Sequence, residues 1–233
     1  MWAWLILLMA LGPAWRGWRS SGLRLPEWVG RSATHAYARL WHRCTIHGSH
    51  RIPRSGPVIL IANHTCSTDP AFLLASSPRP ISFLLAEEYI RLPVISGILR
   101  FLRCVPVQRN GRDLAAVRSA LQRLKAGGVL GIFPEGGLSN AGRGQPKRFK
   151  AGAVLLALRG GAPVLPVLIL GGPQSRHVLD AWLLPSRRRT HIIFGAPVTL
   201  LGNAERRGHR QYLEKTMRQV MELLWSLAGE AGR

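Results

Sequence analysis

The chain has 233 residues, 47% of them hydrophobic, which is enough apolar material for the core of one sizeable domain and excludes a wholly disordered chain. Lysine and arginine number 32 against 11 aspartate and glutamate, so the formal net charge is +21. This excess predicts an anionic partner, whether nucleic acid, an acidic lipid surface or a phosphorylated substrate, and excludes none of the three.

The first predicted element is the uncharged, mostly apolar run 2–15, which has tryptophans at both ends and is followed by Arg16 and Arg19. It is shorter than the roughly 20 apolar residues that a spanning helix needs. It also lacks a charged start and a convincing cleavage signal, which argues against a secretory signal peptide. Tryptophans followed by arginines are typical of an element held at the level of lipid headgroups.

We therefore expect residues 1–43 to form a membrane-anchoring segment, with its arginines on the cytoplasmic face of a bacterial inner membrane. A signal peptide and a helix docked on the core are the alternatives. The stretch from Leu25 to Trp41 mixes apolar aromatic and polar residues, and it is a candidate for a second amphipathic element in the same interface.

From about Cys44 onward, apolar strands alternate with helical patterns. This predicts an α/β domain over residues 44–233, with a largely parallel central sheet flanked by helices and preceded by the membrane-associated helical segment. The predicted strands are Val58–Ala62, Ile81–Ala86, Cys104–Gln108, Val129–Phe133, Val164–Leu170 and His191–Phe194.

Three helices are expected between and after these strands. The clearest begins near Asp113, continues with leucine and valine at helical spacing, and ends at the glycine pair 127–128. A shorter helix covers Ala151–Arg159. The last helix runs from about Asn203, a candidate N-cap, to Leu227, and its apolar stripe fits either core packing or a partner helix.

The three cysteines, Cys44, Cys66 and Cys104, show no C-x-x-C spacing. We therefore expect neither a disulfide framework nor a metal site, but reduced thiols in a cytosol-facing protein. Cys66 lies between His64 and Asp69, so it could serve as a nucleophile or simply be a small buried residue.

His64 and Asp69 follow the apolar strand Val58–Ala62 in a polar turn. In a regular helix, a spacing of five would set the two side chains about 140° apart. They can meet only if the segment between them is a turn, with Asp69 as the N-cap and Pro70 as the first residue of a helix to Ser76. A carboxylate that holds one imidazole nitrogen leaves the other to take a proton from a hydroxyl. On spacing alone, a surface histidine beside a capping aspartate is an equal alternative.

A second polar turn follows the strand Val129–Phe133, where Glu135 precedes the glycine pair 136–137. Glycines at a strand end allow backbone N–H groups to approach an anion closely. The loop beyond carries Arg143, Lys147, Arg148 and Lys150, which by itself is typical of a solvated charge run.

These two turns together resemble the glycerolipid acyltransferase family, that of the 1-acylglycerol-3-phosphate acyltransferases. The resemblance covers about Cys44 to Leu200, and it is specific because several motifs occur in the right order. The matching segments are Asn63–Asp69, Val105–Arg109, Phe133–Gly136, Phe149–Ala153, Val164–Val167 and Phe194–Pro197.

The resemblance implies that His64 is the general base on the acceptor hydroxyl and that Asp69 orients it. It implies direct attack on an acyl thioester of coenzyme A or acyl-carrier protein, without metal, cofactor or acyl-enzyme. Membrane lipids and the acyl donor would be the partners. The implied acceptor- and phosphate-binding residues are Arg109, Glu135, Gly136 and Lys150.

The chain departs from the family pattern after Gly136, where Gly137 and Leu138 replace a threonine and an arginine. Leucine cannot replace a bidentate phosphate contact. Either a later basic residue of the loop compensates, or the acceptor is a lysophospholipid or another lyso-lipid instead of 1-acylglycerol-3-phosphate.

Two other functions stand beside this one. A nucleic-acid-binding module is supported by net charge alone, since the basic residues do not interleave with aromatics in a known binding motif, and we expect no nucleic-acid partner. A serine esterase would need a G-x-S-x-G elbow, which the sequence lacks. A thioesterase activity that uses the same histidine stays open.

Overall fold

The computed structural model describes residues 19, 21–91, 93–108, 113–137, 149–173, 178–186, 188–200 and 210–230. Its centre is a seven-stranded sheet in the order β1-β7-β6-β2-β5-β3-β4. All neighbouring strands are parallel except β6 and β7, which pair antiparallel. The predicted α/β fold with a largely parallel sheet is confirmed. The strands are β1 (Thr45–His47), β2 (Val58–Ala62), β3 (Ile81–Ala86), β4 (Val105–Val107), β5 (Val129–Ile132), β6 (Val164–Leu170) and β7 (His191–Phe194).

Six of these strands match the predicted ones within a residue at each end, and four of them, β2, β3, β6 and β7, are identical in extent. The strand missed by sequence analysis, β1, has three residues and lies at the edge of the sheet, so it carries too little apolar pattern to be recognised. The central strand, β2, has five fully buried residues, as expected for a parallel strand covered on both faces.

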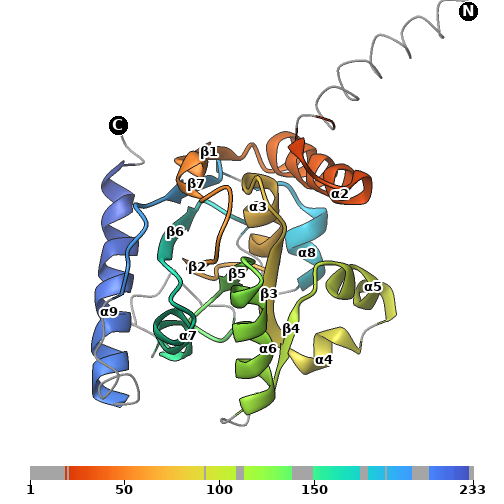
Figure 1. The fold of residues 1–233 in the computed structure, drawn as a ribbon. Helices are drawn as coiled ribbons and strands as arrows, with labels where there is room; N and C mark the ends of the chain where they lie inside the picture. The colour runs from red at the N-terminus through yellow and green to blue at the C-terminus, as the bar shows by residue number, and fades with distance from the viewer. Residues whose placement is uncertain are drawn as a thin grey trace, which may run out of the picture.

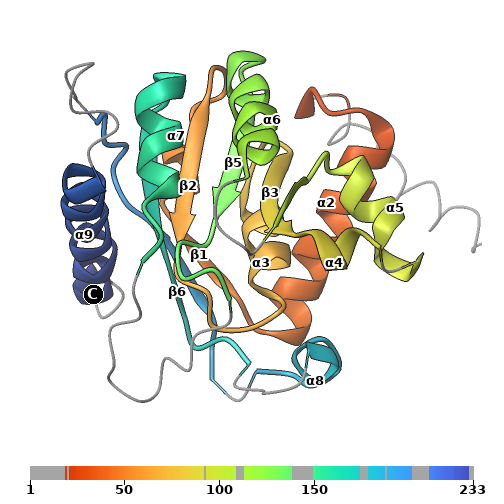
Figure 2. The same cartoon turned by 90° about the horizontal axis from the view of Figure 1, so that it is seen from below.

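Helices cover both faces of the sheet (Figures 1 and 2). The helices of the described ranges are α2 (Leu25–Ala36), α3 (Asp69–Ser76), α4 (Glu87–Ile90), α5 (Pro93–Phe101), α6 (Leu114–Lys125), α7 (Gly152–Gly160), α8 (Val178–Leu183) and α9 (Arg210–Ser226). A π-helical turn η1 (Tyr37–Trp41) continues α2, and 3-10 turns form at η2 (Ser49–Arg51) and η3 (Leu227–Glu230).

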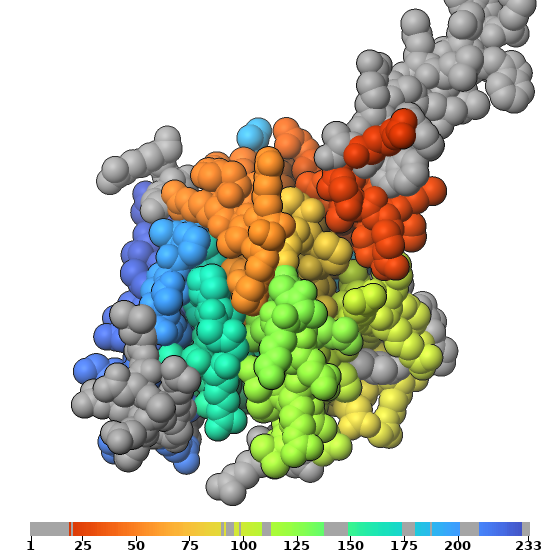
Figure 3. Space-filling view, viewed as in Figure 1, coloured from red at the N-terminus to blue at the C-terminus, as the bar shows by residue number. Residues whose placement is uncertain are grey.

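The two faces of β2 contribute to two separate hydrophobic clusters because successive side chains of a strand point to opposite sides. Ile59 and Ile61 join the cluster beneath α6, α7 and α9. Val58, Leu60 and Ala62 join the cluster that contains the apolar face of α3. In the space-filling view, α6 and α7 cover the middle of the first face (Figure 3).

The predicted helices occur where expected. Asp113 caps α6, since its Oδ1 accepts the backbone N–H of Ala116 at 2.9 Å. The apolar stripe of α9 is buried in the first cluster, which confirms core packing over a partner-helix role. The predicted start of that helix at Asn203 lies outside the described residues.

The stretch from Leu25 to Trp41 is helical, as expected for an amphipathic element, and it contacts α3. Arg31 Nε donates to the carbonyl of Ser77 at 2.7 Å, and His35 Nδ1 lies 3.2 Å from the carbonyl oxygen of Ala75. The predicted anchor at 2–15 lies outside the described residues, and the 43/44 boundary stays a prediction. Within the described ranges, none of the helices has the length and apolar character to cross a membrane.

Candidate active site

The turn that carries His64 is attached to the sheet by Asn63. The amide of this buried side chain donates to the carbonyl of Ile169 at 2.8 Å and accepts the N–H of Ile169 at 2.7 Å. Since β2 and β6 are paired up to Ala62 and Val167, the Asn63 side chain continues the ladder where the backbone of β2 turns away. The position of His64 therefore depends on two adjacent strands.

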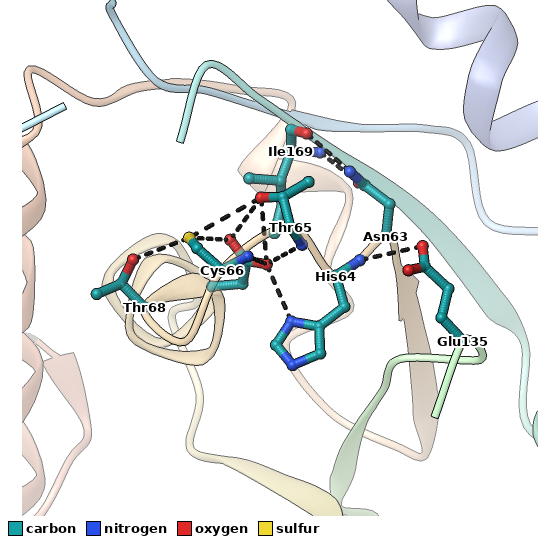
Figure 4. Close-up of polar contacts among 8 residues, drawn as sticks. Asn63, His64, Thr65, Cys66, Thr68, Glu135 and Ile169 are labelled. Carbon is teal, nitrogen blue, oxygen red and sulfur yellow. Dashed lines mark hydrogen bonds and ion pairs between the residues drawn. The ribbon is translucent and has the colours of Figure 1, made fainter. Parts of the chain in front are cut away.

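The carboxylate of Asp69 organises the turn between the two motif residues (Figure 4). Its Oδ2 accepts the backbone N–H groups of Thr65 at 2.6 Å and Cys66 at 2.9 Å. Its Oδ1 accepts the Thr65 hydroxyl at 3.2 Å and the Cys66 thiol at 3.0 Å. The side chain is fully buried, so these bonds replace the water that an ionised carboxylate loses on burial.

The prediction that Asp69 is the N-cap of the following helix is wrong by one residue. Thr68 is the N-cap, and Asp69 is the first helical residue. The Asp69 side chain points back into the preceding turn because that turn presents two backbone N–H groups to it. An acidic residue in the first turn is also favoured by the helix dipole.

His64 and Asp69 meet as the turn geometry requires. His64 Nδ1 lies 3.0 Å from Asp69 Oδ2, and the side chain of His64 is 17% exposed. A carboxylate accepts only, so Nδ1 carries the proton of the neutral ring and Nε2 is its basic nitrogen. Figure 4 shows this second nitrogen on the side of the ring away from the Asp69 contact. The pair has the geometry of a general base and its orienting group.

The second motif lies beside the first because β5 is the neighbour of β2 in the sheet. The Oε1 of Glu135 accepts the backbone N–H of His64 at 3.3 Å. The ring of Phe133 stacks on the imidazole of His64, with centroids 4.1 Å apart and an interplanar angle of 20°. Glu135 therefore holds the turn that carries His64 through its backbone, while Phe133 sets the plane of the ring.

Gly136 and Lys150 lie together at the exposed edge of this site. Gly136 has φ +68°, a conformation that glycine adopts without strain, and its N–H bonds to the carbonyl of Phe133 at 3.1 Å. A Cβ at Gly136 would lie 2.6 Å from Cε and 2.7 Å from Nζ of Lys150. The backbone N–H of Lys150 donates to the carbonyl of Pro134 at 2.8 Å, which ties the two segments together.

Cys66 does not have the environment of a nucleophile. Its side chain is fully buried, and burial, with the neighbouring charge of Asp69, raises the pKa of the thiol to about 12. A reactive cysteine needs a lowered pKa and access to substrate. The nucleophile alternative is therefore contradicted, and the thiol serves as a hydrogen-bond donor to Asp69.

The remaining predicted positions are not placed. Arg109 and Leu138 lie outside the described residues, as do the basic residues of the loop before Phe149. Sequence reasoning assigned no role to Thr65 or Phe133, although both lie within the matching segments Asn63–Asp69 and Phe133–Gly136. Among the described residues, no group of three or more histidine, cysteine, aspartate or glutamate side chains is arranged to hold a metal ion.

In comparison with known protein families, residues 43–170 match the family model described as Acyltransferase. A 1-acyl-sn-glycerol-3-phosphate acyltransferase of Borreliella burgdorferi is 32% identical over 124 residues, which are 52% of this chain and 49% of that protein. The enzyme of the same name from Pseudomonas aeruginosa is 32% identical over 128 residues, 54% of this chain and 48% of that protein. The chain spans about half the length of these curated relatives.

Among solved structures, the 1-acyl-sn-glycerophosphate acyltransferase PlsC from Thermotoga maritima superimposes with a TM-score of 0.64. The match covers 97% of this chain and 90% of that one at 24% sequence identity, and it supports the fold.

Proposed function

Because the chain belongs to the acyltransferase family, we propose that it is an O-acyltransferase that moves a fatty acyl group from acyl-CoA or acyl-carrier protein to the hydroxyl of a lyso-glycerolipid. The acceptor that fits best is 1-acylglycerol-3-phosphate, which places the reaction in phospholipid biosynthesis. The observation that carries the proposal is the contact of His64 Nδ1 with the buried carboxylate of Asp69.

In the proposed reaction, Nε2 of His64 takes the proton of the acceptor hydroxyl as its oxygen attacks the thioester carbonyl. Asp69 stabilises the imidazolium that forms. When the carbon–sulfur bond breaks, the thiolate leaves and takes the proton from His64, so the side chains end as they began. A thiol is a good leaving group, and the scheme needs neither a metal ion nor a cofactor.

The acceptor side of the site would be formed by the basic and glycine-rich edge near Gly136. The side chain of Lys150 lies beside Gly136, where a cation can meet a headgroup phosphate. We assign Arg109 to the same phosphate by family resemblance. Because Leu138 replaces an arginine of the family pattern, a lysophospholipid acceptor is the second candidate.

We also propose that the enzyme works at the cytoplasmic face of a bacterial inner membrane, with residues 1–43 as its anchor. The support is the tryptophan- and arginine-containing N-terminal sequence, the net charge of +21 and the lipid nature of the proposed acceptor. Anionic lipids attract such a surface.

The test is acyl transfer by the purified full-length chain, with labelled acyl-CoA and a panel of lyso-lipids. His64→Ala should abolish formation of acylated lipid while the protein keeps its fold, whereas His50→Ala, a control at an exposed histidine outside the site, should not. Acyl transfer that survives in His64→Ala would disprove the mechanism. Release of free fatty acid in place of acylated lipid would identify a thioesterase.

The phosphate role of Arg109 has its own readout. Arg109→Ala should lower the rate most with phosphate-bearing acceptors, since the contact is specific to that group. Unchanged discrimination between phosphorylated and unphosphorylated acceptors would exclude the assignment without affecting the proposed acyl transfer.

A further inference from the structure

Large apolar side chains are exposed where η1 and α8 meet. Leu40 is 81% exposed and Leu183 68%. We call this set of exposed residues the apolar rim; it consists of Leu40, Trp41, Trp182, Leu183 and Leu184. Contiguous exposed apolar surface on a folded protein marks a site of contact with another molecule or a membrane.

The two segments that carry the rim are joined by contacts between Tyr37 of η1 and Trp182 of α8. The ring of Tyr37 stacks on that of Trp182, with centroids 5.8 Å apart, and its hydroxyl donates to the carbonyl of Trp182 at 2.8 Å. In Figures 1 and 2, α8 lies close to α2, the helix that η1 continues. The rim is therefore one surface formed by two segments far apart in the sequence.

The rim lies at the same end of the sheet as His64. The segment before α8 leaves β6 at Gly171 and Gly172, and β6 runs parallel to β2, which ends just before His64. A Cβ at Gly172 would lie 3.3 Å from the Thr65 hydroxyl and 3.4 Å from the Cys66 thiol, so this segment touches the catalytic turn. In Figure 2, α8 lies beyond the end of the sheet to which the β2 arrow points.

A chain of polar groups runs from Tyr37, which contacts Trp182 of the rim, to Gly171, the residue before Gly172. His42 is fully buried, with Nε2 2.8 Å from the Tyr37 hydroxyl and Nδ1 2.8 Å from the hydroxyl of Ser186. Ser186 lies 3.2 Å from the hydroxyl of Thr190, which donates to the carbonyl of Gly171. The rim is thus held at a fixed position relative to the site.

The charges around the rim favour an anionic surface. The arginines that neighbour it in sequence on both segments are exposed, and they are Arg39, Arg43, Arg188 and Arg189. Tryptophan and leucine flanked by arginine are the residues that proteins place at the boundary between headgroups and acyl chains.

From these observations we infer that the apolar rim inserts into the headgroup region of a bilayer containing anionic lipid, and so presents the His64 end of the sheet to the membrane. This inference rests on the proposed function, because a lipid acceptor held in a bilayer must reach His64 from that side. It adds α8 to the membrane-contacting surface, beyond the N-terminal segment.

The test places an environment-sensitive nitrobenzoxadiazole probe on the full-length chain at Leu183→Cys, in a Cys104→Ser background that leaves the two buried cysteines in place. The matched control carries the probe at Leu223→Cys on α9, where the native side chain is 45% exposed. On vesicles of phosphatidylcholine and phosphatidylglycerol, the probe at 183 should shift to the blue, gain intensity several-fold and be quenched by spin-labelled lipid. The probe at 223 should do none of these.

A probe at 183 that stays in water while the protein sediments with the vesicles overturns the inference, as does a failure of the protein to bind them. A blue shift that appears without vesicles and grows with protein concentration also overturns it, and identifies a second copy of the chain as the occupant.

A double variant, Leu183→Gln with Leu184→Gln, should lower vesicle partitioning roughly tenfold because apolar area is no longer buried in the interface. Leu223→Gln should leave it unchanged. Acyl transfer to a water-soluble short-chain lyso-lipid is measured on the same proteins. If the double variant partitions onto vesicles like the native chain and is fully active on the soluble acceptor, the inference about the rim is overturned but the proposed function is not. If the native chain shows no His64-dependent acyl transfer, the proposed function is overturned.

Discussion

His64 and Asp69 form a contact between one partly exposed and one fully buried side chain, with Nδ1 and Oδ2 3.0 Å apart and side-chain exposures of 17% and 0%. The two side chains therefore have different environments and different roles in the pair. The carboxylate is held in place by four further donors and never reaches solvent, while the ring has one edge at the surface where a substrate can arrive.

Asp69→Asn should lower the turnover rate by about 10³–10⁴-fold, because an amide at this position no longer fixes the tautomer or stabilises the imidazolium. It should also lower the free energy of unfolding by about 1–3 kcal/mol, since an amide NH₂ would face backbone N–H donors. Single-turnover kinetics and urea unfolding measure the two effects. A variant that keeps the native rate would remove Asp69 from the mechanism.

Cys66→Ala should keep the rate within about tenfold of the native value, because it loses one weak donor to Asp69 and no reacting group. Cys66→Ser, which retains a donor, should be closer still. With a thiol pKa of about 12, Cys66 should also resist iodoacetamide at pH 8 in the folded protein. Abolished activity in both variants would restore the nucleophile reading.

Asn63→Leu should lower the free energy of unfolding by about 2–4 kcal/mol, because it leaves both the N–H and the carbonyl of Ile169 without their side-chain partner. Asn63→Asp keeps an acceptor for the N–H of Ile169, so its free energy of unfolding should lie between those of the native protein and Asn63→Leu. Denaturant unfolding gives the values, and equal stability of the three proteins would contradict the stabilising role of the Asn63–Ile169 hydrogen bonds.

Gly136→Ala should destabilise the fold by about 1–2 kcal/mol, since a residue with a Cβ is strained at φ +68°. The added methyl would also displace the end of the Lys150 side chain, so the KM for a phosphorylated acceptor should rise. Gly137→Ala is the matched control, because a Cβ there meets nothing within 4 Å. The same KM in both variants would separate Lys150 from acceptor binding.

Acid should destabilise the protein through His42, because burial lowers the pKa of its ring below 6.5. The unfolded chain takes up a proton near pH 6.5, whereas the folded chain does so only at lower pH. The stability contribution is therefore complete above pH 6.5 and is lost as the pH falls through the folded pKa. The melting temperature of the native protein should fall more steeply below pH 6.5 than that of His42→Gln; parallel curves would exclude His42 as the cause.

The local sequence pattern was sufficient to predict most of the strands and helices. Apolar runs bounded by polar turns marked six strands, and helical spacing with an aspartate cap marked α6. The motif around His64 and Asp69 also indicated a turn, because a continuous helix would separate the two side chains. The predicted N-cap was one residue late, since sequence does not say which way a carboxylate folds back.

From the sequence alone, the α/β class, the turns that end the strands and the pairing of His64 with Asp69 could be predicted, because these depend on contacts within a few residues. Only the tertiary structure decided which turns meet. Strands buried on both faces are apolar throughout, so their sequences do not encode their order in the sheet. The placement of β5 and β6 on either side of β2 brings Glu135 to the backbone of His64 and Ile169 to Asn63. Tertiary packing also buries Cys66 completely, and its thiol serves as a hydrogen-bond donor to Asp69.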